Sequence, residues 1–172
     1  MGTPSMFPSS CARAATATEA RFRINASLAP ARAARIVALD QGAAGVVRRV
    51  AAHEWATARF LVHEGDAPGA GSGIDPPNGP LLRGMDGAPA LLSEELTHAD
   101  VVFMIASEDG GAACASVIGR ACAARGVMTA GLVLGDGYES DGAVAALRPH
   151  ARVLLLSADE SDVAELLTAL RA

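Results

Sequence analysis

Runs of apolar residues alternate along this chain with stretches in which apolar positions recur at helical spacing. An apolar run of about four to eight residues between polar or glycine-bearing turns is typical of a strand that is covered on both faces of a sheet. Five runs of this kind predict strands at residues 35–39, 58–63, 101–106, 127–134 and 152–156.

The stretches between these runs predict helices that connect parallel strands. Valines at helical spacing follow the first run as far as His53, and small residues fill positions 112–125, after which Gly126 supplies a helix end. Connections of this length join parallel neighbours with right-handed crossovers. The sequence therefore predicts an α/β fold: a three-layer αβα sandwich with a doubly wound, mostly parallel five-stranded sheet, Rossmann-like or flavodoxin-like. Further helices are predicted at residues 91–98, 143–147 and 160–172.

Two segments lack this regular pattern. Residues 1–33 carry three prolines and no sustained period, and they predict a loose N-terminal segment ahead of a single domain at 34–172. Residues 64–90 are rich in glycine and proline and predict a long irregular loop. This loop is interpreted either as a surface excursion or as a lid over a pocket.

Composition narrows the classes of function. Apolar residues make up 51% of the chain and aromatic residues 3%, so the core is aliphatic. The net charge of −5 opposes binding to a phosphate backbone, and we expect no nucleic-acid partner. No apolar run reaches the roughly 18 residues that span a bilayer, so no membrane partner is expected. The three cysteines, Cys11, Cys114 and Cys122, are typical of a reducing compartment, and we predict a cytoplasmic protein.

The candidate site lies at the turns that follow the first and third strands. Open parallel sheets bind ligands there, because loop amides and helix N-termini point to that edge. After the first strand, Gly42, Ala43, Ala44 and Gly45 can bring a helix N-terminus to a ligand phosphate, although a tight turn also needs glycine for backbone reasons alone. After the third strand, Ser107 offers a hydroxyl group, and amides come from Gly110 and Gly111.

Charged and nucleophilic residues at these turns leave several interpretations open. Glu108 and Asp109 can line a pocket, coordinate Mg²⁺, act as acid and base, or only stabilise the helix dipole. Cys114, in the first turn of the helix, can have a lowered thiol pKa, whereas Cys122 is expected in the core. Asp66 follows the second strand, where an acidic residue holds a ribose in dinucleotide folds.

Several segments resemble the tubulin/FtsZ GTPase family. Residues 98–106, HADVVFMIA, are similar to the family's strand ADMVFITAG, and residues 125–133, RGVMTAGLV, are similar to its later strand GILTVGVVT. Residues 35–45 resemble the first strand with its glycine-rich loop, and residues 59–66 resemble the second strand, with Asp66 in the place of the family's aspartate. The resemblance covers roughly residues 35–157 and implies a nucleotide site at these loops.

One motif departs from the family. Where the family has GGGTGTG, residues 108–114 read EDGGAAC, so two carboxylates stand where a phosphate would lie. We therefore expect a degenerate, truncated relative that binds a nucleotide or another small ligand weakly, without GTPase activity and without catalytic residues. Mg²⁺ is implied only if Glu108 and Asp109 take part. The alternatives are a non-catalytic homo-oligomeric interaction module, or a small enzyme that uses Glu108, Asp109 or Cys114.

Overall fold

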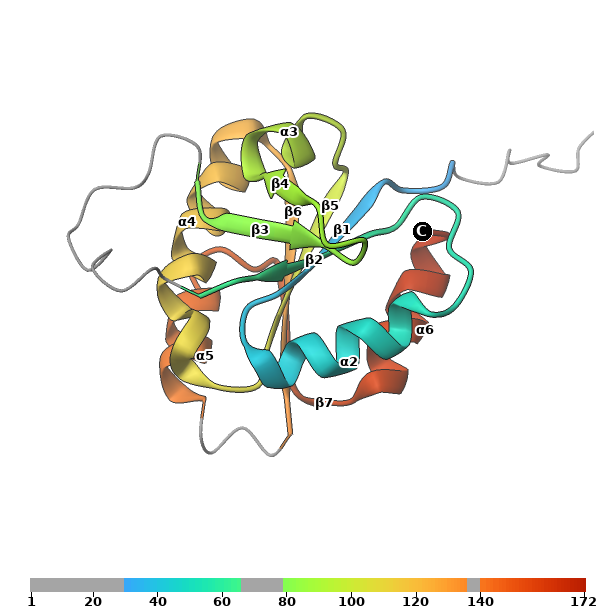
Figure 1. The fold of residues 1–172 in the computed structure, drawn as a ribbon. Helices are drawn as coiled ribbons and strands as arrows, with labels where there is room; N and C mark the ends of the chain where they lie inside the picture. The colour runs from blue at the N-terminus through green and yellow to red at the C-terminus, as the bar shows by residue number, and fades with distance from the viewer. Residues whose placement is uncertain (1–29, 66–78, 136–139) are drawn as a thin grey trace, which may run out of the picture. The chain divides into compact units, whose positions relative to one another are not determined.

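The computed structural model describes residues 30–65, 79–135 and 140–172, and it shows a seven-stranded mixed sheet with helices on both faces (Figure 1). The strand order is β4-β3-β2-β1-β5-β6-β7. The strands are β1 (Ala34–Ala38), β2 (Arg59–His63), β3 (Leu81–Gly84), β4 (Pro89–Leu91), β5 (Val101–Ala106), β6 (Met128–Leu134) and β7 (Val153–Ala158). The helices are α2 (Gln41–Ala51), α3 (Leu92–Thr97), α4 (Ala112–Arg125), α5 (Asp141–Leu147) and α6 (Glu160–Leu170), with a 3₁₀ turn η1 (Asp109–Gly111) before α4.

The five predicted strands are present and run parallel to one another as β2, β1, β5, β6 and β7. The predicted strand count of five is wrong, because β3 and β4 add an antiparallel hairpin beside β2. These strands have four and three residues; β3 lies within the glycine- and proline-rich stretch 64–90 and β4 crosses its end, where no apolar run was long enough to indicate them. Residues 66–78 of that stretch lie outside the described residues.

The hydrophobic core has two halves, one on each face of the sheet. Alternate residues of β1 separate them, since Ile36 belongs to one half and Val37 to the other. Helices α2 and α6 cover the Ile36 face, and α3, α4 and α5 cover the Val37 face (Figure 1). These layers confirm the predicted αβα sandwich among the described residues. Within the same residues, no helix combines the length and the apolar character that a membrane span needs.

The chain changes direction between β1 and β5. From β1 it passes through α2 on one face to β2, whereas from β5 it passes through α4 on the opposite face to β6. Helices on opposite faces are what two crossovers of the same hand require when they move in opposite directions across the sheet. The carboxyl ends of β1 and β5 are therefore neighbours at a topological switch point, which is the usual ligand position in such sheets.

Candidate functional site at the carboxyl edge of the sheet

Asp40, the residue before α2, holds the switch point together. Its carboxylate accepts a hydrogen bond from the amide of Ala43 at 2.8 Å, which caps the helix. The same carboxylate accepts from the Ser107 amide at 2.7 Å, from the Ser107 hydroxyl, and from the Glu108 amide at 3.1 Å. The amides that would hold a ligand phosphate between β1 and β5 are thus already bonded to an anion of the protein itself.

Glycines allow the two loops to approach this closely. A Cβ atom on Gly42 would overlap the Ser107 side chain, and one on Gly111 would lie 2.6 Å from the backbone oxygen of Leu39. Gly110 differs, because a Cβ there would meet no atom within 4 Å. Gly42 and Gly111 are therefore needed for packing, whereas Gly110 borders open space.

The two acidic residues predicted at this turn have different surroundings. Asp109 accepts a hydrogen bond from the amide of Ala143 at 2.8 Å, so its carboxylate caps the start of α5. Glu108 is exposed. Ser140 ties α5 to the same loop by donating its hydroxyl to the Ser107 carbonyl at 3.0 Å. Within residues 30–65, 79–135 and 140–172, no group of three histidine, cysteine or acidic residues is arranged to hold a metal ion.

An open pocket of about 610 Å³ lies next to the switch point, over the carboxyl ends of β1 and β2; we call it the Arg48 pocket. It continues past α2 to the turn between β3 and β4. Val62 and Met85 form an apolar part of its wall. Gln41 and Gly110 border its end near the switch point. The lining residues are Leu39, Asp40, Gln41, Arg48, Val62, His63, Glu64, Gly65, Arg83, Gly84, Met85, Gly87 and Gly110.

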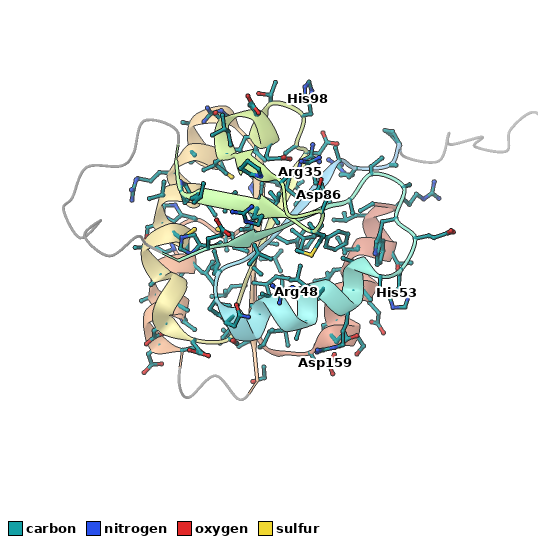
Figure 2. The ribbon with its side chains drawn as sticks, viewed as in Figure 1. Arg35, Arg48, His53, Asp86, His98 and Asp159 are labelled. Atoms are coloured by element: carbon teal, nitrogen blue, oxygen red, sulfur yellow. The ribbon has the colours of Figure 1, made fainter. Side chains whose placement is uncertain are left out.

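The charges of the Arg48 pocket are unequally paired. Arg83 donates to both oxygens of Glu64, with Nη2 to Oε2 at 2.9 Å, and this contact lowers the pKa of the Glu64 carboxyl. Arg48, an exposed residue of α2 (Figure 2), has no ion pair with any residue that the structure describes. His63 is buried, and its Nδ1 lies 3.3 Å from the Leu39 carbonyl oxygen. The described wall of the pocket therefore holds the Arg83–Glu64 pair, the Asp40 carboxylate and Arg48, which has no ion pair among the described residues.

The structure brings most of the predicted site residues to one edge of the sheet, but their surroundings there differ. Ala43 and Ala44 are fully buried in the core, and their amides bond to Asp40. Gly42, Ser107 and Gly111 form the packed switch point, and Gly45 lies one helical turn away from it. Asp66 lies outside the described residues. Ligand contact by these residues stays a prediction.

Sequence reasoning missed the residues that shape the charge of this edge. Asp40 had a recognisable signal, because an aspartate immediately before a helix is a preferred cap. Arg48 had none, since an arginine on a helix surface is usually solvated. Arg83 lies on a strand that the pattern did not reveal, so its contact with Glu64 could not be foreseen.

The two helical cysteines are enclosed. Cys114 and Cys122 are both buried among the residues that pack on the α4 face of the sheet. Burial raises the pKa of the Cys122 thiol to about 12, so it stays protonated at neutral pH. The expectation that Cys122 belongs to the core is confirmed.

Comparison with known proteins adds no counterpart for this site. No protein-family model matches the chain, and no curated protein matches it. What the edge binds must therefore be inferred from its own residues, and these offer an open, partly apolar pocket beside a closed switch point, with Arg48 on its wall.

Proposed function

We propose that this protein binds a small anionic ligand of the nucleotide class in the Arg48 pocket and does not hydrolyse GTP. The observation that carries the proposal is an open pocket at the carboxyl edge whose wall includes Arg48, an arginine with no ion pair to any residue that the structure describes. Its volume of about 610 Å³ falls within the range of small-molecule sites, roughly 300–1,000 Å³. An arginine guanidinium is well matched to phosphate oxygens.

The charges of this edge favour a small anion over a triphosphate. The Asp40 carboxylate fills the position between β1 and β5 in which helix amides would hold phosphates, and Glu108 stands exposed beside it. In the Arg48 pocket a phosphate can bind the Arg48 guanidinium, and the base of a nucleotide can pack on Val62 and Met85. The same arrangement supports the absence of GTP hydrolysis, because a triphosphate at the switch point would displace or oppose these groups.

The resemblance to the tubulin/FtsZ family enters as a second part of the proposal. We infer a diverged relative of the family's nucleotide-binding domain in which the phosphate loop has been replaced by an internal contact. Two observations support this. The segments that resemble the family become four strands that are consecutive in the sheet, β2, β1, β5 and β6, and the altered motif at 108–114 follows β5 at their carboxyl edge. The contact of Asp40 with Ser107 and Glu108 would be the product of that replacement.

Calorimetric titration with GMP, GDP, GTP, ATP, NAD and FMN, with and without Mg²⁺, tests the proposal. We expect one of them to bind, and Arg48→Gln to weaken its binding by about tenfold, as the loss of a charged hydrogen bond does. Arg49→Gln is the matched control: Arg49 is the next residue of α2 and pairs with Glu160 instead. Binding of none of these ligands, or equal affinities in the two variants, would overturn the proposal. Release of phosphate from GTP by the parent chain would overturn the proposal that the protein does not hydrolyse GTP.

A further inference from the structure

A second pocket, of about 480 Å³, lies at the opposite edge of the sheet, where β6 and β7 begin; we call it the amino-edge pocket. On the side of α4 its wall consists of small residues, Gly119, Ala123 and Gly126, and Val127 adds apolar surface. The amino-edge pocket shares no described lining residue with the Arg48 pocket, so the two are separate sites.

Arg152 brings a positive charge to the amino-edge pocket. It precedes β7 and lines the pocket together with Thr129 of β6, whose carbonyl accepts a hydrogen bond from the Arg152 amide at 2.9 Å. The Arg152 residue is exposed, and its guanidinium has no hydrogen bond or ion pair with any residue that the structure describes. This cation is therefore available to a ligand as far as the described part of the chain is concerned.

His150 is held in place on another wall of this pocket. Its backbone amide donates to the Leu147 carbonyl at 3.0 Å, and its own carbonyl accepts from the Thr129 hydroxyl. A Cβ atom on Gly119 would overlap Cγ of the His150 ring, so the imidazole packs directly on the backbone of α4. The ring nitrogens have no partner among the described residues. Because no buried side-chain nitrogen or oxygen there lacks a partner, these nitrogens reach accessible space.

The charges of the amino-edge pocket fit an anion with a single negative charge. None of the described residues that line it is an aspartate or a glutamate, and Arg152 supplies a full positive charge. A guanidinium binds a carboxylate through two parallel hydrogen bonds, and an imidazole N–H can donate another. Helix α4 ends beside the pocket at Gly126, and the partial negative charge of a helix C-terminus opposes a dianion more than a monoanion. A carboxylate therefore fits better than a phosphate.

We propose that the amino-edge pocket binds a small molecule with one carboxylate and a short apolar body. The Arg152 guanidinium holds the carboxylate, and the His150 ring donates a hydrogen bond to one of its oxygens. The apolar body lies against Ala123 and Val127, where the small side chains of the α4 wall leave room for it. This ligand differs in chemistry and in position from the nucleotide proposed for the Arg48 pocket, so the two bind independently.

Amide NMR titration with butyrate, benzoate and methyl phosphate tests the charge of the ligand. We expect a carboxylate to shift the amides of Gly119, Thr129 and Arg152, and Arg152→Gln to weaken its binding by about tenfold, because a charged pair is lost. Arg148→Gln is the matched control: Arg148 is also exposed and without an ion pair to a described residue, but it lies outside the pocket. The proposal is overturned if neither carboxylate shifts these amides, if methyl phosphate binds as tightly as the carboxylates, or if both variants weaken binding equally.

Filling the pocket from α4 tests its location without a change of charge. Ala123→Leu adds bulk to the pocket wall, and Ala124→Leu adds the same side chain at the next position, which does not line the pocket. Both alanines are exposed and leucine is a good helix former, so we expect both variants to fold, as circular dichroism can check.

Ala123→Leu should weaken carboxylate binding at least about tenfold, and Ala124→Leu should leave it unchanged. Equal affinities in the two variants would overturn the assignment of the site. An Arg48→Gln variant should keep the carboxylate titration of the parent chain, so a failure of nucleotide binding at the Arg48 pocket and a failure of this proposal give different results.

Discussion

Two neighbouring regions at the carboxyl edge of the sheet differ in how their polar groups are used. At the switch point, four donors from Ala43, Ser107 and Glu108 converge on the Asp40 carboxylate. The Arg48 pocket has an open volume, and Arg48 on its wall forms no ion pair within the described part of the chain. Topology alone favours the first region as a ligand site, but its hydrogen-bonding capacity is already satisfied within the protein.

The difference shows that a ligand position set by strand order also needs unsatisfied groups. Backbone amides at a helix N-terminus attract anions in general, and an aspartate side chain meets that demand as well as a phosphate does. Because the Asp40 carboxylate occupies the switch point, the Arg48 pocket next to it is the better candidate for the ligand site. Two properties can therefore be tested separately: whether the switch point is closed to a ligand, and whether the Arg48 pocket is open to one.

The largest effect is expected from closing the last space at the switch point. Gly111→Ala places a Cβ 2.6 Å from the Leu39 backbone oxygen, which cannot move without shifting β1, and we expect a loss of about 3 kcal/mol in the free energy of unfolding. Gly110→Ala is the neighbouring control and should change this free energy by less than about 0.5 kcal/mol. Urea denaturation measures both. Similar losses in the two variants would show that the loops are not packed as described.

A somewhat smaller loss of stability is expected when the Asp40 carboxylate is removed. Asp40→Ala leaves amides of Ala43, Ser107 and Glu108 without their acceptor, and we expect a loss of about 2 kcal/mol. The vacated position should then accept an external anion. Inorganic phosphate should therefore raise the melting temperature of Asp40→Ala more than that of the parent chain.

An Arg48→Gln background removes the other anion site from that experiment. In this background, phosphate should still stabilise Asp40→Ala and should have little effect when Asp40 is present. If phosphate stabilises both to the same degree, the Asp40 carboxylate does not occupy an anion position, and the contrast between the two regions fails.

A smaller effect is expected at the wall of the Arg48 pocket. Glu64 neutralises Arg83 there, so Glu64→Gln should raise the affinity for an anionic ligand by about two- to fivefold in a calorimetric titration. Arg83 holds the pKa of Glu64 below its ordinary value, so the carboxylate keeps its charge on going from pH 7 to about pH 5. The ion pair is lost only as the pH falls through that lowered pKa. If the parent chain binds the anion more tightly as the pH falls from 7 to 5, and Glu64→Gln removes this change, Glu64 takes up a proton above pH 5 and the pairing is contradicted.

Much of the architecture could be predicted from local pattern. The helix expected at residues 112–125 is α4, and Gly126 ends it in the left-handed conformation. The helix expected at the C-terminal end of the sequence is α6, and Asp159 precedes it in a capping box, with its carboxylate accepting from the amides of Ser161 and Asp162. These signals lie within a few residues of the features that they predict, so one sequence is sufficient to read them.

The remaining features depend on contacts between distant segments. Asp40 and Ser107 are far apart in the sequence, and only the pairing of β1 with β5 brings them together. The short strands β3 and β4 form because β2 offers an edge, and Arg83 reaches Glu64 only through that pairing. Residue type indicated what each group could do, but the neighbours that decide its use appear only in the folded chain.

A two-dimensional amide NMR titration with the best-binding nucleotide tests the central claim most directly, because it reports the two regions separately. We predict that the largest shift changes fall on residues of the Arg48 pocket, at Arg48, Val62 and the segment 83–87. The amides bonded to Asp40, those of Ala43, Ser107 and Glu108, should change little. The largest changes at those three amides, with the Arg48 pocket unaffected, would contradict the account.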